Sequence, residues 1–205
     1  MKKTGSLIVI SGPSGVGKST LIGKVRANMP ELEFSISCTT RAPRTGEVHG
    51  REYYFLSEEE FLRREENKEF IETAGVFAHR YGTLKSEVMN RLTAGKSVLL
   101  DIDVQGALSI RKAAAEDPAL AACAAFILIA PPDLPTLEKR LRSRATDAEE
   151  QILRRLGAAQ KELSHFRAYD FMVVNDNLEK AAFELESLLK CLQLRTSLIT
   201  EELFQ

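Results

Sequence analysis

Four short apolar runs recur along the chain, and each has the length of a buried strand. Segments with helical periodicity separate them, as is typical of a parallel sheet covered by helices on both faces. The sequence therefore predicts an α/β fold. The expected strands are residues 7–10, 98–100, 124–130 and 171–174.

Two segments interrupt this pattern. Residues 34–96 contain polar, strand-like pieces at 34–37 and 53–56, which indicates an inserted lobe. Residues 137–163 are helical in period and rich in arginine, which predicts a basic helical lid. The core would then comprise residues 1–33, 97–136 and 164–205.

Polar side chains mark several helix boundaries. A Ser-x-x-Glu capping box at 57–60 predicts a helix over Glu58–Glu66. Asp147 predicts the N-cap of the second of two lid helices. Residues 178–203 place apolar side chains, including Phe183, at helical spacing, which predicts one closing helix packed on the core.

The clearest chemical signal is the segment GPSGVGKST, which follows the first apolar run and precedes a helical stretch. Its spacing G-x-x-x-x-G-K-[ST] is that of a phosphate-binding loop, whose glycines let successive backbone N–H groups face phosphate oxygens. Lys18 would reach the β- and γ-phosphates, and the Ser19 hydroxyl would ligate Mg²⁺. The sequence thus predicts a nucleoside triphosphate site formed by Gly12, Pro13, Ser14, Gly15, Val16, Gly17, Lys18, Ser19 and Thr20.

Two carboxylates follow the apolar run at 98–100. A carboxylate at the C-terminal end of a parallel strand lies at the crevice where α/β proteins bind ligands. We therefore expect Asp101 to organise the water shell of Mg²⁺, with Asp103 near it. The alternative is that both aspartates cap the helix that begins near Val104, a role that one of them can combine with binding.

A second phosphate site is indicated inside the lobe. Arg41 and Arg44 lie three residues apart in a stretch that Pro43 and Gly46 stiffen and turn, and Tyr53 follows. Arginine forks and a tyrosine hydroxyl together suit a monophosphate group away from the first loop. By spacing alone, the arginines are equally consistent with a solvated surface pair.

Composition narrows the range of partners. Lys+Arg 28 and Asp+Glu 29 give a net charge of -1, so no nucleic-acid partner is expected. The three cysteines are few and far apart, so we expect free thiols rather than disulfides or a metal site. Because the chain shows neither a signal sequence nor an apolar run near ~20 residues, we expect a cytoplasmic protein without a membrane partner.

Several segments, in this order, resemble the guanylate kinase family, whose members transfer the γ-phosphate of ATP to GMP. The resemblance extends from Gly5 to about Leu189. It implies a P-loop fold of the nucleoside monophosphate kinase type, ATP as co-substrate with Mg²⁺, and GMP and dGMP as acceptors; a homo-oligomer is compatible with it. The segments are GPSGVGKST, SISCTTRAPRTGEVHGREYYF, EFIE followed by YGT, LLDIDVQG, RATDAEEQILRRL and YDFMVVND.

The resemblance also implies roles for single residues. The guanine ring would be read by Ser37, Glu72, Thr83 and Asp103, and the GMP phosphate would be held by Arg41, Arg44, Tyr53 and Tyr81. Lys18, Arg41, Arg144 and Arg155 would form the catalytic set, and Asn175 would lie near the adenine. The chain departs from the family pattern at Ala145, where glycine is usual, at Arg80, where tyrosine is common, and at Thr83, where some relatives have serine.

Guanine chemistry supports the assignment of Glu72. A carboxylate can accept from the adjacent N1–H and N2–H₂ donors of guanine at once, whereas adenine presents an acceptor at N1. A site built on such hydrogen bonds rejects an analogue that lacks them. We therefore expect GMP to be preferred over AMP, with direct in-line transfer of the phosphoryl group.

Three other functions compete with this interpretation. An inert interaction module of the same family would typically lack the intact phosphate loop. A GTPase switch would need an N-K-x-D motif, which the residues around Asn175 do not supply. A kinase for another small phosphate acceptor stays open until acceptors are compared.

Overall fold

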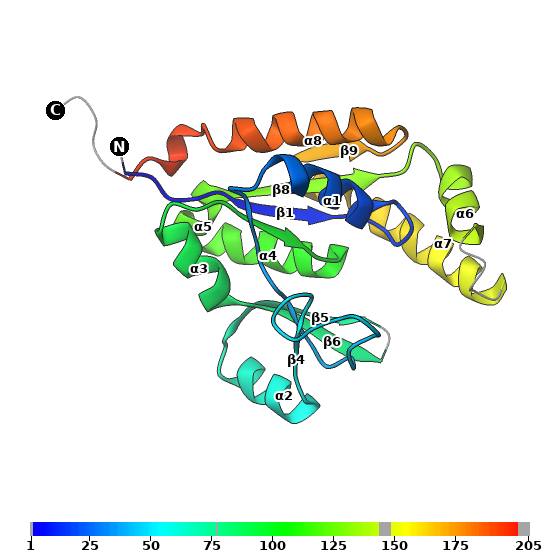
Figure 1. The fold of residues 1–205 in the computed structure, drawn as a ribbon, viewed down its shortest axis with the longest axis horizontal. Helices are drawn as coiled ribbons and strands as arrows, with labels where there is room; N and C mark the ends of the chain where they lie inside the picture. The colour runs from blue at the N-terminus through cyan, green and yellow to red at the C-terminus, as the bar shows by residue number, and fades with distance from the viewer. Residues whose placement is uncertain (1, 77, 144–148, 201–205) are drawn as a thin grey trace.

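A five-stranded parallel sheet forms the centre of the structure (Figure 1), a computed structural model that describes residues 2–76, 78–143 and 149–200. The strand order is β2-β7-β1-β8-β9, and all pairs are parallel. The predicted α/β class is confirmed, and the four predicted strands are present, two of them one residue longer than expected. The strands are β1 Leu7–Ser11, β2 Glu33–Phe34, β7 Val98–Asp101, β8 Ala124–Ala130 and β9 Phe171–Val174.

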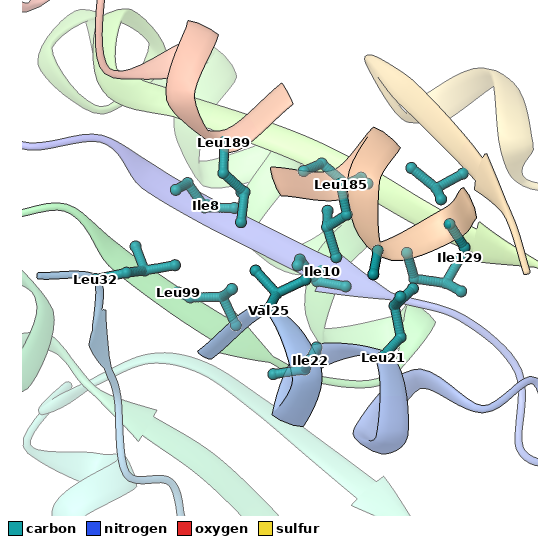
Figure 2. Packing of buried hydrophobic residues seen from close by; sticks show 14 of the residues in the cluster. Ile8, Ile10, Leu21, Ile22, Val25, Leu32, Leu99, Ile129, Leu185 and Leu189 are labelled. Carbon is teal, nitrogen blue, oxygen red and sulfur yellow. The ribbon is translucent and has the colours of Figure 1, made fainter. Parts of the chain in front are cut away.

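Strand β1 is buried on both faces, because its side chains alternate between two hydrophobic clusters. Ile8 and Ile10 pack with helices α1 (Lys18–Asn28) and α8 (Leu178–Leu192), as Figure 2 shows. Leu7 and Val9 contribute to the cluster on the opposite face of the sheet. That face is covered by helices α3 (Lys85–Thr93), α4 (Val104–Glu116) and α5 (Pro118–Cys123).

A second sheet lies within the predicted lobe and has the order β4-β3-β6-β5. Helix α2 (Glu58–Glu66) packs its buried Phe61 in a stack with Phe70, next to Cys38. This lobe therefore has a small core of its own. Its strands are β3 Cys38–Thr39, β4 Tyr54–Phe55, β5 Phe70–Val76 and β6 His79–Leu84.

The strand predicted over residues 34–37 is wrong. Strand β2 ends at Phe34 and belongs to the central sheet, where Phe34 is paired with Leu99 of β7. The polar Ser35 makes one more backbone bond, from its N–H to the Leu99 carbonyl at 3.1 Å, before the chain leaves for the lobe. Helix α3 also lies within the predicted lobe range, yet it packs its apolar side chains into the cluster of the central sheet.

Helix boundaries at the lobe and lid follow the capping residues. Ser57 caps α2 by accepting from the Glu60 N–H at 3.1 Å, but the Glu60 carboxylate bonds to Arg64 rather than returning to the cap. Near the predicted lid range, α6 (Leu134–Arg142) begins before residue 137 and is capped by Asp133, and α7 (Glu149–Leu163) follows. The predicted cap Asp147 lies outside the described residues.

The closing helix is shorter than predicted. Helix α8 ends at Leu192, and the chain then turns through a short 3-10 segment at Thr196–Leu198. There it pairs with the N-terminus, because the Thr200 N–H donates to the Lys2 carbonyl at 3.1 Å. The packing predicted for Phe183 is also wrong, since this side chain is 73% exposed. Among the described residues, no helix is both long and apolar enough to cross a bilayer.

Helix α8 offers a matched pair of positions for a test of core packing. Leu185→Ala removes a fully buried side chain and should lower the free energy of unfolding by about 2 to 5 kcal/mol. Phe183→Ala, two residues earlier on the exposed face, should change it by less than about 0.5 kcal/mol. Urea unfolding of both variants would check this, and equal losses would contradict the packing described here.

Candidate active site

A cleft of about 830 Å³ lies between the phosphate loop, the end of β7, the second sheet and helix α7. It collects residues from stretches that lie far apart in the sequence. Most of the predicted site residues line it, including Asp101 at the end of β7 and Asp103 just after it. The predicted residues along the cleft are Gly12, Pro13, Ser14, Gly15, Gly17, Lys18, Ser19, Thr20, Ser37, Tyr53, Glu72, Tyr81, Asp101, Asp103 and Arg155.

The phosphate loop joins β1 to α1 through two glycines in the left-handed region. Gly15 has a φ of 89° and Gly17 a φ of 91°, a conformation that side chains with a Cβ rarely adopt. A Cβ at Gly17 would also stand 2.6 Å from the Asn175 amide nitrogen. The loop therefore packs closely against the chain after β9 and places its N–H groups at the start of α1.

Asn175 has a clear structural contact in this arrangement. Its side chain is buried, and its Nδ2 donates to the Val16 carbonyl at 2.8 Å. Arg140 of α6 donates to the Asn175 carbonyl at 2.8 Å. Val16 and Asn175 are not among the described residues that line the cleft, and their contacts support the loop from behind.

Lys18 is held at the carboxyl edge of the sheet. Its Nζ lies 2.5 Å from Asp101 Oδ1 and donates to the Ile102 carbonyl at 2.8 Å. Asp101 therefore pairs with the loop lysine, and it is Asp103 that caps α4. The Asp103 Oδ1 accepts from the Gly106 N–H at 2.8 Å, so the predicted capping role falls to one of the two aspartates.

Glu72 of β5 is the buried carboxylate of the site. Its side chain is only 6% exposed, and its Oε1 accepts from the Thr83 hydroxyl at 2.7 Å. Burial, with a further contribution from the nearby Asp103 charge, raises the pKa of Glu72 to about 7, although the bond from Thr83 opposes this shift. Two carboxylates from different parts of the chain thus approach each other across the base of the cleft.

A cationic and aromatic group lies in the lobe beside the cleft; Tyr53 and Tyr81 line the cleft, whereas Arg41 is not among the described residues that line it. Arg41 lies over the Tyr53 ring, 5.5 Å from its centroid, and the Tyr53 and Tyr81 rings meet edge to face at 6.0 Å. Glu47 fixes this loop, because its carboxylate accepts from Arg41 Nη2 at 2.9 Å and from the Arg44 N–H at 2.8 Å. The ion pair with Glu47 raises the pKa of Arg41.

The remaining predicted residues lie in different surroundings. The Arg44 side chain is exposed and is not among the described residues that line the cleft, and Thr83 is buried behind Glu72. Arg144 and the departure at Ala145 lie outside the described residues. Arg80, where tyrosine is common in the family, makes a contact within the lobe: its Nε donates to Glu58 of α2 at 2.7 Å. The departure at Thr83 keeps the hydroxyl that bonds to Glu72.

Sequence reasoning missed several residues of the cleft wall. Gln105 of α4 and Arg154 and Glu162 of α7 line it as well. Arg154 directly precedes Arg155, a predicted lid arginine, so the arginine-rich segment could have pointed to it. No sequence signal pointed to Glu162, because its proximity to Asp103 depends on how α7 packs. Burial and the Asp103 charge raise the pKa of Glu162.

The parallel sheet, the loop after β1 and its paired lysine define the chain as a P-loop nucleotide-binding protein. The sequence profile of the guanylate kinase family matches residues 4–192. The chain belongs to the guanylate kinase family, a family of nucleoside monophosphate kinases.

Relatives cover almost the whole chain. A guanylate kinase from Desulfotalea psychrophila is 46% identical over 185 residues, which is 90% of this chain and 88% of that protein. A guanylate kinase from Thermotoga maritima is 44% identical over 186 residues, 91% of this chain and 86% of that protein. The crystal structure of a guanylate kinase from Anaplasma phagocytophilum has a TM-score of 0.76 and 34% identity, and it covers 96% of this chain and 90% of that chain.

The buried carboxylate should make stability depend on pH in a defined direction. The pKa of Glu72 is about 7 in the folded chain and 4.5 ordinarily, so the folded state binds more protons between these values. Its contribution to stability is therefore present below about pH 4.5 and is lost as the pH rises through about 7. Glu72→Gln, which cannot ionise, should be more stable than the parent by about 2 to 3 kcal/mol near pH 8 and nearly equal near pH 4.5.

Urea unfolding at both pH values measures this difference. Glu31→Gln, at an exposed position, is the matched control and should show no such pH-dependent gain. A Glu72→Gln variant that is equally stable at both pH values would contradict the burial cost assigned to the ionised carboxylate.

Proposed function

We propose that this chain catalyses Mg²⁺-dependent transfer of the γ-phosphate of ATP to GMP, giving ADP and GDP, in the cytoplasm. The observation that carries the proposal is the pair Glu72 and Asp103 on the wall of the cleft that the phosphate loop also lines. One end of the cleft suits a triphosphate, and the other suits a purine with hydrogen-bond donors on its edge. The three free thiols are consistent with a reducing compartment.

Base selection follows from the acceptors at the base of the cleft. Glu72 Oε1 is already bonded to Thr83, so the carboxyl group is oriented before a ligand arrives. Guanine would donate from N1–H and N2–H₂ to the two carboxylates, with Ser37 beside them. Adenine would bring its N1 lone pair toward a carboxylate, leaving a buried acceptor without a donor, which is costly.

The acceptor phosphate would be held by the lobe. Arg41 is stacked against Tyr53 and close to Tyr81, so a guanidinium and two phenol hydroxyls form one group. Arg44, whose backbone is fixed by Glu47, would swing in from the exposed side. Because every proposed contact is made to the base or the phosphate, removal of the 2′-hydroxyl loses none of them, and dGMP should also react.

Transfer would proceed in line and without a covalent intermediate. A GMP phosphate with a second pKa near 6 is already mostly dianionic near pH 7, so its oxygen attacks without a strong general base. Lys18 and the loop N–H groups would stabilise charge on the donor phosphates, and Arg155 of the lid would act from the opposite wall. Arg144 is assigned the same role, and Asn175 a place near the adenine, from the family resemblance alone.

The donor set near the loop fits magnesium. Ser19 supplies a hydroxyl and Asp101 a partly exposed carboxylate, and both line the cleft beside Lys18. Hard oxygen ligands and few protein contacts are what Mg²⁺ uses when phosphates and waters complete its shell. The metal would neutralise charge on the β- and γ-phosphates, with Asp101 acting through water.

An acceptor panel tests the proposed function directly. Purified protein with ATP and Mg²⁺ should phosphorylate GMP and dGMP, with kcat/KM for AMP, CMP and UMP lower by about 10⁴-fold or more. Glu72→Ala should raise the KM for GMP and reduce the preference over AMP, because the acceptor of the base edge is gone. Coupled detection of ADP measures each rate, and equal use of GMP and AMP by the parent protein would refute the proposal.

Lys18 should matter for chemistry more than for acceptor binding. Lys18→Ala should lower kcat by about 100-fold or more while the KM for GMP changes little, because the lost charge acts on the transferring phosphoryl group. Lys24→Ala is the matched control, since Lys24 lies on the same helix and pairs with Glu179 at an exposed site. Steady-state kinetics with GMP varied at saturating ATP would separate the two constants, and a loss confined to KM would contradict this role.

A further inference from the structure

Gly106 lies next to the carboxylate of Glu72. It is the third residue of α4, and this helix packs against β5, the strand that carries Glu72. A Cβ added at Gly106 would stand 2.7 Å from Glu72 Oε2 and 3.2 Å from its Cδ. It would also stand 3.3 Å from Asp103 Oδ1. The two carboxylates of the site therefore converge on the one position of this helix turn that has no side chain.

Backbone geometry does not account for a glycine here. The φ of Gly106 lies outside the left-handed region, and the residue has helical neighbours on both sides of the turn. In a helix interior alanine is preferred to glycine, because glycine loses more conformational freedom on folding. The absent side chain is thus explained by the carboxylate that occupies its space.

Gly106 contacts both acceptors in different ways. Its N–H donates to Asp103 Oδ1 at 2.8 Å, which fixes that aspartate at the start of α4. Its bare Cα lets Glu72 Oε2 approach α4 while Oε1 keeps the bond from Thr83. The carboxylate of Glu72 therefore lies between the Thr83 hydroxyl on one side and the Cα of Gly106, which carries no side chain, on the other.

We propose that Gly106 is a specificity-determining positioning residue, which sets the distance between Glu72 and α4 so that Glu72 and Asp103 together match the edge of guanine. The inference rests on the proposed function. A methyl group at this position must displace Oε2 outward into the cleft or rotate the carboxylate away from Thr83. Either movement misaligns the acceptor pair, while the phosphate loop and Lys18 stay in place.

Gly106→Ala tests the inference through a split between kinetic constants. The KM for GMP should rise by about 10-fold or more, the size of one lost hydrogen bond in a buried site, and the ratio of kcat/KM for GMP over AMP should fall by a similar factor. The kcat at saturating GMP should change by less than about 3-fold. Gly23→Ala is the matched control: it adds the same methyl group within α1, where a Cβ meets nothing within 4 Å, and it should leave both readouts unchanged.

A double variant separates positioning from general damage to the structure. In the Glu72→Ala background the clash with the Glu72 carboxylate is gone, so adding Gly106→Ala should not lower the GMP over AMP ratio further. Stability should show the same dependence: Gly106→Ala should lower the urea midpoint of the parent protein but not that of the Glu72→Ala variant. Because the acceptor ratio does not depend on the folded fraction, a partly unfolded Gly106→Ala sample still gives that measurement.

Each outcome has a distinct meaning. Failure of the parent protein to prefer GMP would refute the proposed function rather than the role of Gly106. A parent that prefers GMP, with Gly106→Ala unchanged in KM and acceptor ratio, would overturn the inference. Losses from Gly106→Ala that are as large without Glu72 as with it would also overturn it.

Discussion

The pairing of β1 with β7 fixes the geometry on which the rest of the site depends. β1 lies between β7 and β8, with Ile10 in register with Asp101, and its backbone and side chains are buried. Because parallel strands end at the same edge, this register places the loop after β1 beside the carboxylate of Asp101 at the end of β7. The contact between Lys18 and Asp101 is a direct consequence. Removing apolar contacts under β1 would therefore disturb the nucleotide site as well as the fold.

The buried carboxylate of Glu72 has weaker partners than the cations of the site. Arg41 pairs with Glu47, and Lys18 pairs with Asp101, so these cations have carboxylate partners. Glu72 instead accepts from a neutral hydroxyl and lies near another carboxylate, and burial raises its pKa to about 7. A buried, incompletely compensated charge costs folding free energy. A ligand that donates two hydrogen bonds there would recover part of this cost, so the same desolvation that weakens the fold would favour the proposed guanine ligand on binding.

The sequence predicted the central strands, the phosphate loop, helix α2 and the family, because apolar runs, capping residues and glycine spacing are local signals. It did not predict that β2 stops at Phe34 or that α8 stops at Leu192, since pairing with β7 and with the N-terminus decides those ends. Nor could it find the role of Gly106. That glycine meets Glu72, 34 residues earlier in the chain, only because α4 packs on β5. Long-range packing, which no spacing encodes, sets these details.

The proposed base site is divided between two parts of the structure. Glu72 and Thr83 belong to strands of the second sheet, whereas Asp103 and Gly106 belong to a helix that covers the central sheet. The acceptor pair therefore exists only while β5 lies against α4. Any shift between the two sheets changes the separation of the carboxylates before it changes the phosphate loop, which is anchored to β1 and α1. Recognition of the base is consequently more sensitive to the placement of the lobe than recognition of the triphosphate is, and the lack of a side chain at Gly106 defines how closely the two parts meet.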